Sequence, residues 1–376
     1  MHTNRTSCRL SAISSQPGVR RSGIHQGDNP QSEIRHAAGK FDGIRNPQSF
    51  DVVGFGALNL DYIYSIEDLS ILGPLMDISP GQELFLPNRL FEETKAFLEQ
   101  HARLMNTSGG GSAANTVFAL GRMGFKTGYI GKVGKDKAGD FLVKSLPNVD
   151  CSHVQRQGKT GACISVIDRH KDRSILLFPN TNNTASVRKK DMEAVTRAQF
   201  AHFSSFAGDK PFVAQVRMAQ ALGPGVRLSL DPGQLYAEKG LSAILPLVGR
   251  CFILFVTETE VQILTGKDYH AGSRELLEPG PAIVACKRGG KGSFVLSRDE
   301  ELEIPAESVE VVDNTGAGDV YDAAFLAGLL MERPLRDCAL FATKMAARSI
   351  TGPGRSRYPT RKDLSELRIA NCGLRN

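Results

Sequence analysis

The most informative stretch of the chain is Asp313–Asp319, which reads DNTGAGD. It follows a β-like run, Val309–Val312, and precedes a segment in which apolar residues recur at the spacing of a helix. A strand, a turn of small residues and a helix N-terminus would leave the backbone N–H groups of Gly316, Ala317 and Gly318 unpaired and pointing outward. Because such a terminus binds anions, the stretch predicts a site for a phosphoryl group.

Asp319 has two interpretations at the head of this helix. It can cap the helix by accepting a hydrogen bond from the first turn, as Asp commonly does. It can also act as a general base, because a carboxylate beside an anion hole can take the proton of a hydroxyl that attacks the bound phosphate. The residue alone leaves both interpretations open, and the accompanying motifs decide between them.

The rest of the chain, from Phe50 onward, alternates short β-rich runs with longer helical segments. The runs that read as strands are 51–56, 127–133, 226–231, 251–257, 282–287 and 293–297. This alternation predicts an α/β fold with a doubly wound, mainly parallel sheet flanked by helices, which binds ligands at the carboxyl ends of its strands. Two segments break the alternation, about 62–91 and 161–178, and we expect them to form a small β-sheet lid over that cleft.

The first 46 residues differ in composition from the rest of the chain. They are rich in Ser, Arg, Gly and Asn and lack apolar periodicity, so we expect a disordered leader before one folded domain over 47–376. Four Arg and no acidic residue up to Gly27 are typical of an organelle transit peptide. The alternatives are a variable tail or a wrongly chosen start codon, and for these we expect a cytoplasmic protein.

Composition excludes several classes of protein. The longest apolar runs are far shorter than the roughly 20 residues that cross a bilayer. The seven cysteines are scattered without a C-x-x-C pair, which suits a reducing compartment and argues against a structural zinc site. The net charge of +6 lies mostly in the first 50 residues, because 39 Lys and Arg face 37 Asp and Glu in the remainder. We therefore expect no nucleic-acid partner.

Two glycine-containing motifs lie nearer the amino end. Gly54–Asp61 (GFGALNLD) begins like a dinucleotide fingerprint, but Asn59 stands where the third glycine belongs, which disfavours a nicotinamide-dependent oxidoreductase. Asn59 and Asp61 suit hydrogen bonds to substrate hydroxyls, although a turn is an equally good interpretation. Gly109–Asn115 (GGGSAAN) opens a helix, and its glycines either form a flexible turn or let the backbone and Asn115 touch a small polyol.

Taken together, these motifs resemble the ribokinase/PfkB carbohydrate kinase family over roughly residues 50–360. The amino-terminal G-x-x-N-x-D motif is present as Gly56–Asp61, and the first family signature runs from Gly110 to about Gly134. The second covers Asp313–Leu326, with Asn314 where Thr is commoner. Two long signatures in the expected order make the match specific, and it implies a ribokinase-like fold.

The resemblance implies a role for each matching residue on the acceptor side of the cleft. The substrate would be held by Asn59, Asp61, Gly110, Gly111 and Asn115. Asp319 would be the general base, and Gly316–Gly318 would form the anion hole. Arg173 resembles an arginine that reaches the transferred phosphate in nucleoside-kinase relatives, whereas a solvated arginine at a strand end is the alternative.

On the nucleotide side the resemblance implies ATP, Mg²⁺ and a monovalent cation such as K⁺. The T-x-G-x-x-G motif matches Lys287–Gly292, with Lys in place of Thr, so Lys287, Gly289 and Gly292 would cradle the phosphates or ribose of ATP. Glu260, from an N-x-x-E motif whose Asn is Thr257 here, would orient Mg²⁺ through water. Asp313 and Thr315 match positions that help to hold the monovalent cation.

The implied activity is that of an ATP-dependent kinase acting on a hydroxymethyl group of a sugar or nucleoside, with no membrane partner and a quaternary structure compatible with a homodimer. The expected helical insertion 90–105 resembles adenosine-kinase-like members, while Asn59 with Asp61 is the ribokinase arrangement, and we favour a sugar. A catalytically silent member that binds a metabolite or has a regulatory role is the remaining alternative. Retention of Asp319 and of the glycines disfavours it.

Overall fold

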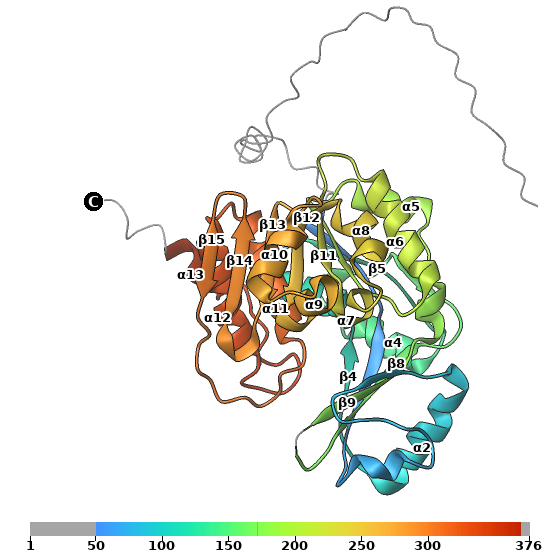
Figure 1. Ribbon diagram of the computed structural model, residues 1–376. Helices are drawn as coiled ribbons and strands as arrows, with labels where there is room; N and C mark the ends of the chain where they lie inside the picture. Colours follow the sequence, from blue (N-terminus) through green and yellow to red (C-terminus); the bar gives the residue numbers. More distant parts are fainter. Residues whose placement is uncertain (1–49, 171, 370–376) are drawn as a thin grey trace, which may run out of the picture. The chain divides into compact units, whose positions relative to one another are not determined.

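The computed structural model describes residues 50–170 and 172–369, so our expectations for residues 1–46 lie outside the described part of the chain. Its main sheet has ten strands, with the order β15-β14-β13-β12-β11-β10-β1-β5-β6 and β7 beside β5. Strands β11 to β15 and β5 of this sheet are labelled in Figure 1. The strands are β1 (Val52–Phe55), β5 (Thr127–Val133), β6 (Val149–Asp150), β7 (Val154–Arg156), β10 (Phe200–Ser204), β11 (Arg227–Asp231), β12 (Cys251–Thr257), β13 (Ile283–Lys287), β14 (Ser293–Ser297) and β15 (Glu301–Ile304). Only the β13–β14 and β14–β15 pairings of this sheet are antiparallel, which confirms a mainly parallel α/β sheet.

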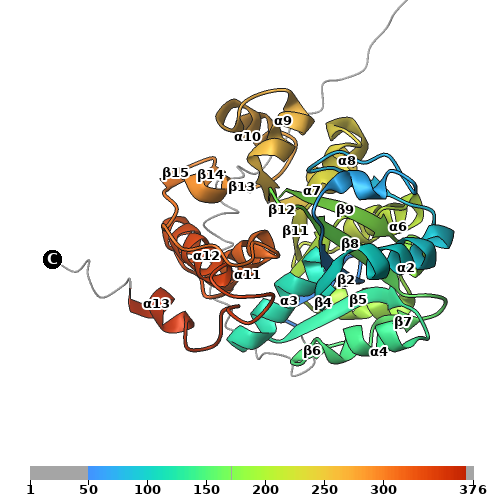
Figure 2. The same cartoon turned by 90° about the horizontal axis from the view of Figure 1, so that it is seen from below.

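Helices cover both faces of this sheet (Figure 2). Strand side chains alternate between two apolar clusters: Ile253 and Phe255 of β12 pack into one, Leu254 and Val256 into the other. The first cluster includes side chains of α3 (Ser112–Met123), α11 (Ala317–Leu330), α12 (Leu335–Ser349) and α13 (Leu364–Ile369). The second includes side chains of α6 (Asp209–Ala221), α8 (Leu241–Val248), α9 (Glu258–Thr265) and α10 (Tyr269–Leu277).

A second, five-stranded sheet has the order β3-β9-β8-β2-β4. Its strands are β2 (Asn59–Ser65), β3 (Glu83–Phe85), β4 (Arg103–Gly110), β8 (Gly161–Ile167) and β9 (Arg173–Phe178). The expected pair of strands within 161–178 is confirmed, since β8 and β9 pair antiparallel with Ala162 opposite Phe178. Helix α2 (Phe91–His101) contributes Leu98 to a separate apolar core under this sheet.

Three sequence expectations differ from the structure. Val309–Val312 is irregular rather than a strand, and its Val311 and Val312 side chains are 59% exposed. The insertion 90–105 is helical only to His101, because β4 begins at Arg103. Asn59 and Asp61 lie within β2 rather than in a turn, so the turn interpretation is wrong.

The remaining described elements are short connections: α4 (Lys137–Lys144), α5 (Lys189–Val195), α7 (Gly233–Ala237), and the 3-10 helices η1 (Leu69–Leu72), η2 (Asn88–Leu90), η3 (Asn180–Thr184) and η4 (Gly289–Lys291). Within the described residues, no helix is both long enough and apolar enough to cross a membrane.

Candidate active site

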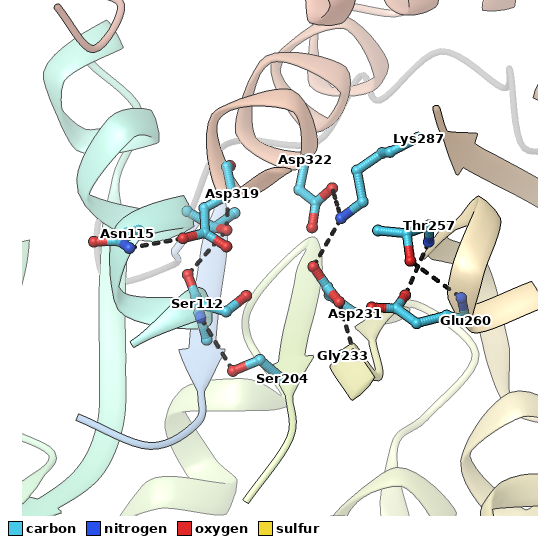
Figure 3. Close-up of polar contacts among 12 residues, drawn as sticks. Ser112, Asn115, Ser204, Asp231, Gly233, Thr257, Glu260, Lys287, Asp319 and Asp322 are labelled. Atoms are coloured by element: carbon cyan, nitrogen blue, oxygen red, sulfur yellow. Dashed lines mark hydrogen bonds and ion pairs between the residues drawn. The ribbon is translucent and has the colours of Figure 1, made fainter. Parts of the chain in front are cut away.

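A recess of about 560 Å³ opens at the carboxyl ends of β11, β12 and β13, beside the N-terminus of α11. Charged and small residues form its wall, and Figure 3 shows the polar contacts around it. The lining residues are Ser112, Ser205, Asp231, Gly233, Thr257, Glu258, Thr259, Glu260, Lys287, Arg288, Gly289, Gly318 and Asp319. Its position matches the general rule that open α/β sheets bind ligands at the carboxyl ends of strands.

The N-terminus of α11 is built by Gly316, which occupies the N-cap position with a left-handed φ of 78°. A Cβ at this position would lie 1.9 Å from the hydroxyl oxygen of Tyr358, so only glycine fits. Among the described residues, the backbone N–H groups of Gly316 and Gly318 have no hydrogen-bond partner. The expectation that Ala317 is also free is wrong, because its N–H donates to the carbonyl of Asn314 at 3.3 Å.

Asp319 is the third residue of α11, so the interpretation that it is the N-cap is wrong. Its Oδ2 accepts a hydrogen bond of 2.7 Å from the side-chain amide of Asn115 (Figure 3). Burial raises the pKa of Asp319 to about 6, although the hydrogen bond from Asn115 acts in the opposite direction. A carboxyl with a pKa near 6 is well matched to taking up a proton near neutral pH.

The side chain of Asn115 connects Asp319 to an arginine that the sequence analysis missed. Asn115 Oδ1 accepts a hydrogen bond of 2.9 Å from Nε of Arg355, whose Nη1 donates to the carbonyl of Ser145. The Arg355 guanidinium lies over the ring of Phe118, and its Nη2 has no partner among the described residues. Asn115 thus orients Asp319, and its expected contact with substrate stays a prediction.

The pairing of β2 with β4 brings the remaining acceptor-side residues together. Asn59 lies opposite Gly110 in this pairing, and a Cβ on Gly110 would be 1.9 Å from Oδ2 of Asp61. Gly111, with a φ of 120°, approaches the carbonyl of Ala57 so closely that a Cβ would be 2.1 Å from it. Burial raises the pKa of Asp61 to about 7, while the charge of Arg173 opposes this effect.

Arg173 joins the second sheet to the loop before α11, and Asp313 fixes that loop. Arg173 of β9 donates from Nη1 to Oγ1 of Thr315 at 3.0 Å and from Nη2 to the hydroxyl of Ser165. Asp313 accepts from the N–H groups of Thr315 and Gly354, each at 2.9 Å. Burial raises the pKa of Asp313, but these two donors hold it below its usual value. Arg173 is therefore not a solvated arginine, because the loop of the anion site fixes it.

Lys287 occupies an unexpected place between two carboxylates. Its Nζ donates to Asp231 Oδ2 at 2.9 Å and to Asp322 Oδ1 at 3.1 Å (Figure 3). Burial lowers the pKa of Lys287, but Asp231, Asp322 and the nearby Glu260 outweigh this effect, and the pKa lies well above its ordinary value. A Cβ on Gly318 would be 3.3 Å from Nζ, so the ammonium lies next to the first turn of α11.

The nucleotide-side motifs are only partly brought together. Thr257 and Glu260 form a reciprocal capping box at the start of α9, with Thr257 N–H donating to Glu260 Oε2 at 2.9 Å. Burial, followed by the charge of Asp231, raises the pKa of Glu260 to about 7. Gly289 lines the recess, but Gly292 does not. Gly292 instead packs against the backbone of β15, where a Cβ would meet the carbonyl of Ile304 at 1.9 Å.

The same wall offers two carboxylates to a metal ion such as Mg²⁺. Among the described residues, no group of three or more His, Cys, Asp or Glu side chains could hold a metal ion. Glu260 and Asp231 nevertheless both line the recess with carboxylate oxygens, the ligand type that Mg²⁺ prefers. Mg²⁺ usually keeps several of its waters, so this donor set fits an ion that Glu260 would contact through water.

Comparisons with known proteins give a consistent result. The model of the pfkB family carbohydrate kinases matches residues 91–361. An uncharacterized sugar kinase of Archaeoglobus fulgidus is 30% identical over 237 residues, which are 61% of this chain and 94% of that relative. Adenosine kinase from Sinorhizobium meliloti has a similar fold, with a TM-score of 0.74 and 21% identity over 86% of this chain and 99% of that one. Arabidopsis thaliana ribokinase, solved with ribose and ATP, has a TM-score of 0.70 and 23% identity over 85% and 98%.

Proposed function

The chain belongs to the pfkB family of carbohydrate kinases, and from this premise we propose that it transfers the γ-phosphate of ATP to a hydroxymethyl group of a sugar or nucleoside. The observation that carries the proposal is the pairing of Asp319 with the helix terminus beside it. Gly316 and Gly318 offer free N–H groups to a phosphoryl group, and Asp319 follows them on the same first turn. One small region thus holds both groups that the reaction needs.

In the proposed reaction, the oxygen of the acceptor hydroxyl forms a bond to the γ-phosphorus, and the bond from this phosphorus to the bridging oxygen of ADP breaks. Asp319 takes the hydroxyl proton, and Asn115 keeps its carboxylate oriented through the 2.7 Å hydrogen bond. The N–H groups of Gly316 and Gly318 stabilise the charge on the transferred phosphoryl group. Arg173, fixed at Thr315, adds a positive charge on the side of the second sheet.

Mg²⁺, when bound, would neutralise charge on the nucleotide phosphates. Glu260 is the residue that we propose to orient it through water, with Asp231 as the neighbouring carboxylate. For K⁺, the carboxylate of Asp313 remains the proposed contribution, although both of its oxygens already accept backbone hydrogen bonds.

We propose that the acceptor lies between Asp319 and the second sheet, with Asn59, Asp61 and the Gly110–Gly111 backbone as its partners. Asn59 Oδ1 already accepts a hydrogen bond from Asn182, so its NH₂ group is left to donate to a hydroxyl. Arg173 and Arg355 both lie close enough to Asp61 for their charges to lower its pKa, against the effect of burial. Such a dense set of donors and acceptors supports a polyol, and we favour a sugar over a nucleoside.

The test is a screen of ADP formation together with acceptor phosphorylation, over pentoses, hexoses and nucleosides with ATP and Mg²⁺ present. We expect one class of acceptor to stimulate ADP formation in proportion to phosphorylated product. Binding of these compounds without formation of ADP from ATP in the presence of any of them would contradict the proposal and favour the catalytically silent alternative.

A further inference from the structure

A second recess, of about 580 Å³, lies at the same edge of the main sheet. It is lined by Lys132 near the end of β5, Lys159 before β8, Lys210 in the first turn of α6, and polar residues that include Thr181 and Thr184 of η3. No Asp or Glu is among its lining residues. It shares no lining residue with the recess beside Asp319.

Lys132 is the residue that makes this recess unusual. The residue is 6% exposed, yet its Nζ has only neutral acceptors, namely the hydroxyl of Thr184 at 2.8 Å and the carbonyl of Thr184 at 3.4 Å. Among the described residues, no carboxylate lies within 4.0 Å of the ammonium of Lys132 or of Lys210. Buried lysines are rare unless they are paired, so the charge calls for an anion from outside the chain.

The surrounding charges strengthen this argument. Lys132 and Lys210 both line the recess, and burial followed by the charge of Lys210 lowers the pKa of Lys132. The acid next to Lys210, Asp209, is already paired with Lys239 at 2.8 Å. Nζ of Lys159 lies 3.9 Å from Oε1 of Glu92, and both of these side chains are largely exposed.

We propose that this recess binds the phosphate group of a small phosphorylated metabolite, at a site separate from the centre of phosphoryl transfer. A phosphate monoester carries a charge of nearly −2 at neutral pH, which the two unpaired ammonium groups would neutralise. The recess falls within the usual range of small-molecule pockets, roughly 300–1,000 Å³, and is larger than inorganic phosphate requires. A metabolite with an uncharged body beyond its phosphate therefore fits better than the free ion.

The 3-10 helix η3 lies between the lysine recess and the acceptor-side residue Asn59. In a 3-10 helix, residues i and i+3 lie on one side, and Thr181 and Thr184 both face the lysine recess. Asn182 between them points the other way, donating to Asn59 Oδ1 at 2.8 Å and to the carbonyl of Leu58. The proposed site is thus connected to an acceptor-side residue, but its existence does not depend on the proposed kinase reaction.

The experiment measures binding to the full-length protein by calorimetric titration. The probes are inorganic phosphate and glycerol 2-phosphate. The variants are Lys132→Gln and Lys210→Gln, and Lys144→Gln on α4 is a control that removes one exposed positive charge outside both recesses. We expect each recess variant to weaken binding of glycerol 2-phosphate roughly tenfold or more, and the control to leave it unchanged.

The outcomes distinguish the proposal from its rivals. Tighter binding of glycerol 2-phosphate than of inorganic phosphate supports a monoester, and the reverse order overturns that part of the proposal. Equal binding to the wild type and both recess variants would assign the anion to the N-terminus of α11 and overturn the site. Lys210 is exposed, so its variant keeps the test decisive even where Lys132→Gln fails to fold.

Discussion

Lys287 and Lys132 are two lysines of the same sheet, near the carboxyl ends of β13 and β5. Burial alone would lower the pKa of both. The Lys287 side chain is 10% exposed and Lys132 is 6% exposed. Their pKa values nevertheless shift in opposite directions, well above the ordinary value for Lys287 and below it for Lys132. Two carboxylates surround the first ammonium and none lies beside the second, so the partners rather than the burial decide the direction.

The comparison separates two uses of a buried positive charge. Burial raises the pKa of Asp231, but Lys287 holds it below its ordinary value, so the charge of Lys287 is neutralised within the protein by Asp231. Burial raises the pKa of Asp322 well above its ordinary value, and its Oδ1 accepts a hydrogen bond from the same ammonium. Lys287 thus holds β11, β13 and α11 together behind the N-terminus of α11. The charge of Lys132 has no counterpart among the described residues and is available to a ligand. Substitutions at the two recesses should therefore have different consequences for turnover, stability and binding.

The largest effect on turnover is expected for Asp319→Asn, in the recess beside the N-terminus of α11. An amide cannot take the proton of the acceptor hydroxyl, so we expect kcat to fall by roughly 10² to 10⁴ while both substrates still bind. Steady-state kinetics and binding titrations would check this. Asp209→Asn is the matched control, since Asp209 is exposed and outside both recesses. Near wild-type turnover in a folded Asp319→Asn variant would refute the proposed mechanism.

Lys287→Met should mainly cost stability. It leaves Asp231 and Asp322 buried without their shared cation, and breaking such a buried pair typically costs about 3–5 kcal/mol. Urea unfolding would measure the loss. Adding Asp231→Asn should recover part of it, because one uncompensated carboxylate is then removed. A free energy of unfolding equal to that of the wild type would mean that the cluster is not an ion pair in solution.

Much of this arrangement could be predicted from the sequence. The rest could not, for physical reasons that differ from residue to residue. The central strands were found because strands buried on both faces read as continuous apolar runs. The exposed, polar and glycine-rich strand β4 gives no such signal. Lys287 could be read only as part of a nucleotide motif, because Asp231 and Asp322 lie 56 and 35 residues away along the chain. Arg355 was missed because Asn115, its partner, is 240 residues distant.

Asp61→Ala should affect the acceptor but not the nucleotide. Hydrogen bonds that involve a charged group are worth roughly 1.5–3 kcal/mol, which corresponds to about a ten- to hundredfold rise in the acceptor KM. The KM for ATP should stay near its wild-type value, because Asp61 does not line the recess beside Glu260 and Lys287. Initial rates with each substrate varied in turn would test this. Loss of ATP affinity alone would reverse the assignment of the two sides.

The pH dependence of kcat/KM should report the raised pKa of Asp319. A general base works as the carboxylate, so activity should be retained above a pH of about 6 and fall roughly tenfold for each unit below it. Asp61, with a pKa of about 7, would titrate in the same profile. The Asp61→Asn variant separates the two titrations, because the fall of kcat/KM near pH 6, which is due to Asp319, should persist in that variant. Activity that stays constant down to pH 4.5 would exclude Asp319 as the base.

The smallest effect is expected for Lys132→Met, and it tests the comparison most directly. Methionine keeps an unbranched, largely apolar side chain of similar length, and the substitution removes an ammonium that burial disfavours. Thr184 retains a partner, since its hydroxyl donates to the carbonyl of Thr181 at 2.8 Å. No buried carboxylate is left without its cation. We therefore expect the free energy of unfolding, measured in urea without added anions, to stay within about 1 kcal/mol of wild type or to rise. A loss as large as that of Lys287→Met would show that Lys132 already has an anionic partner within the protein.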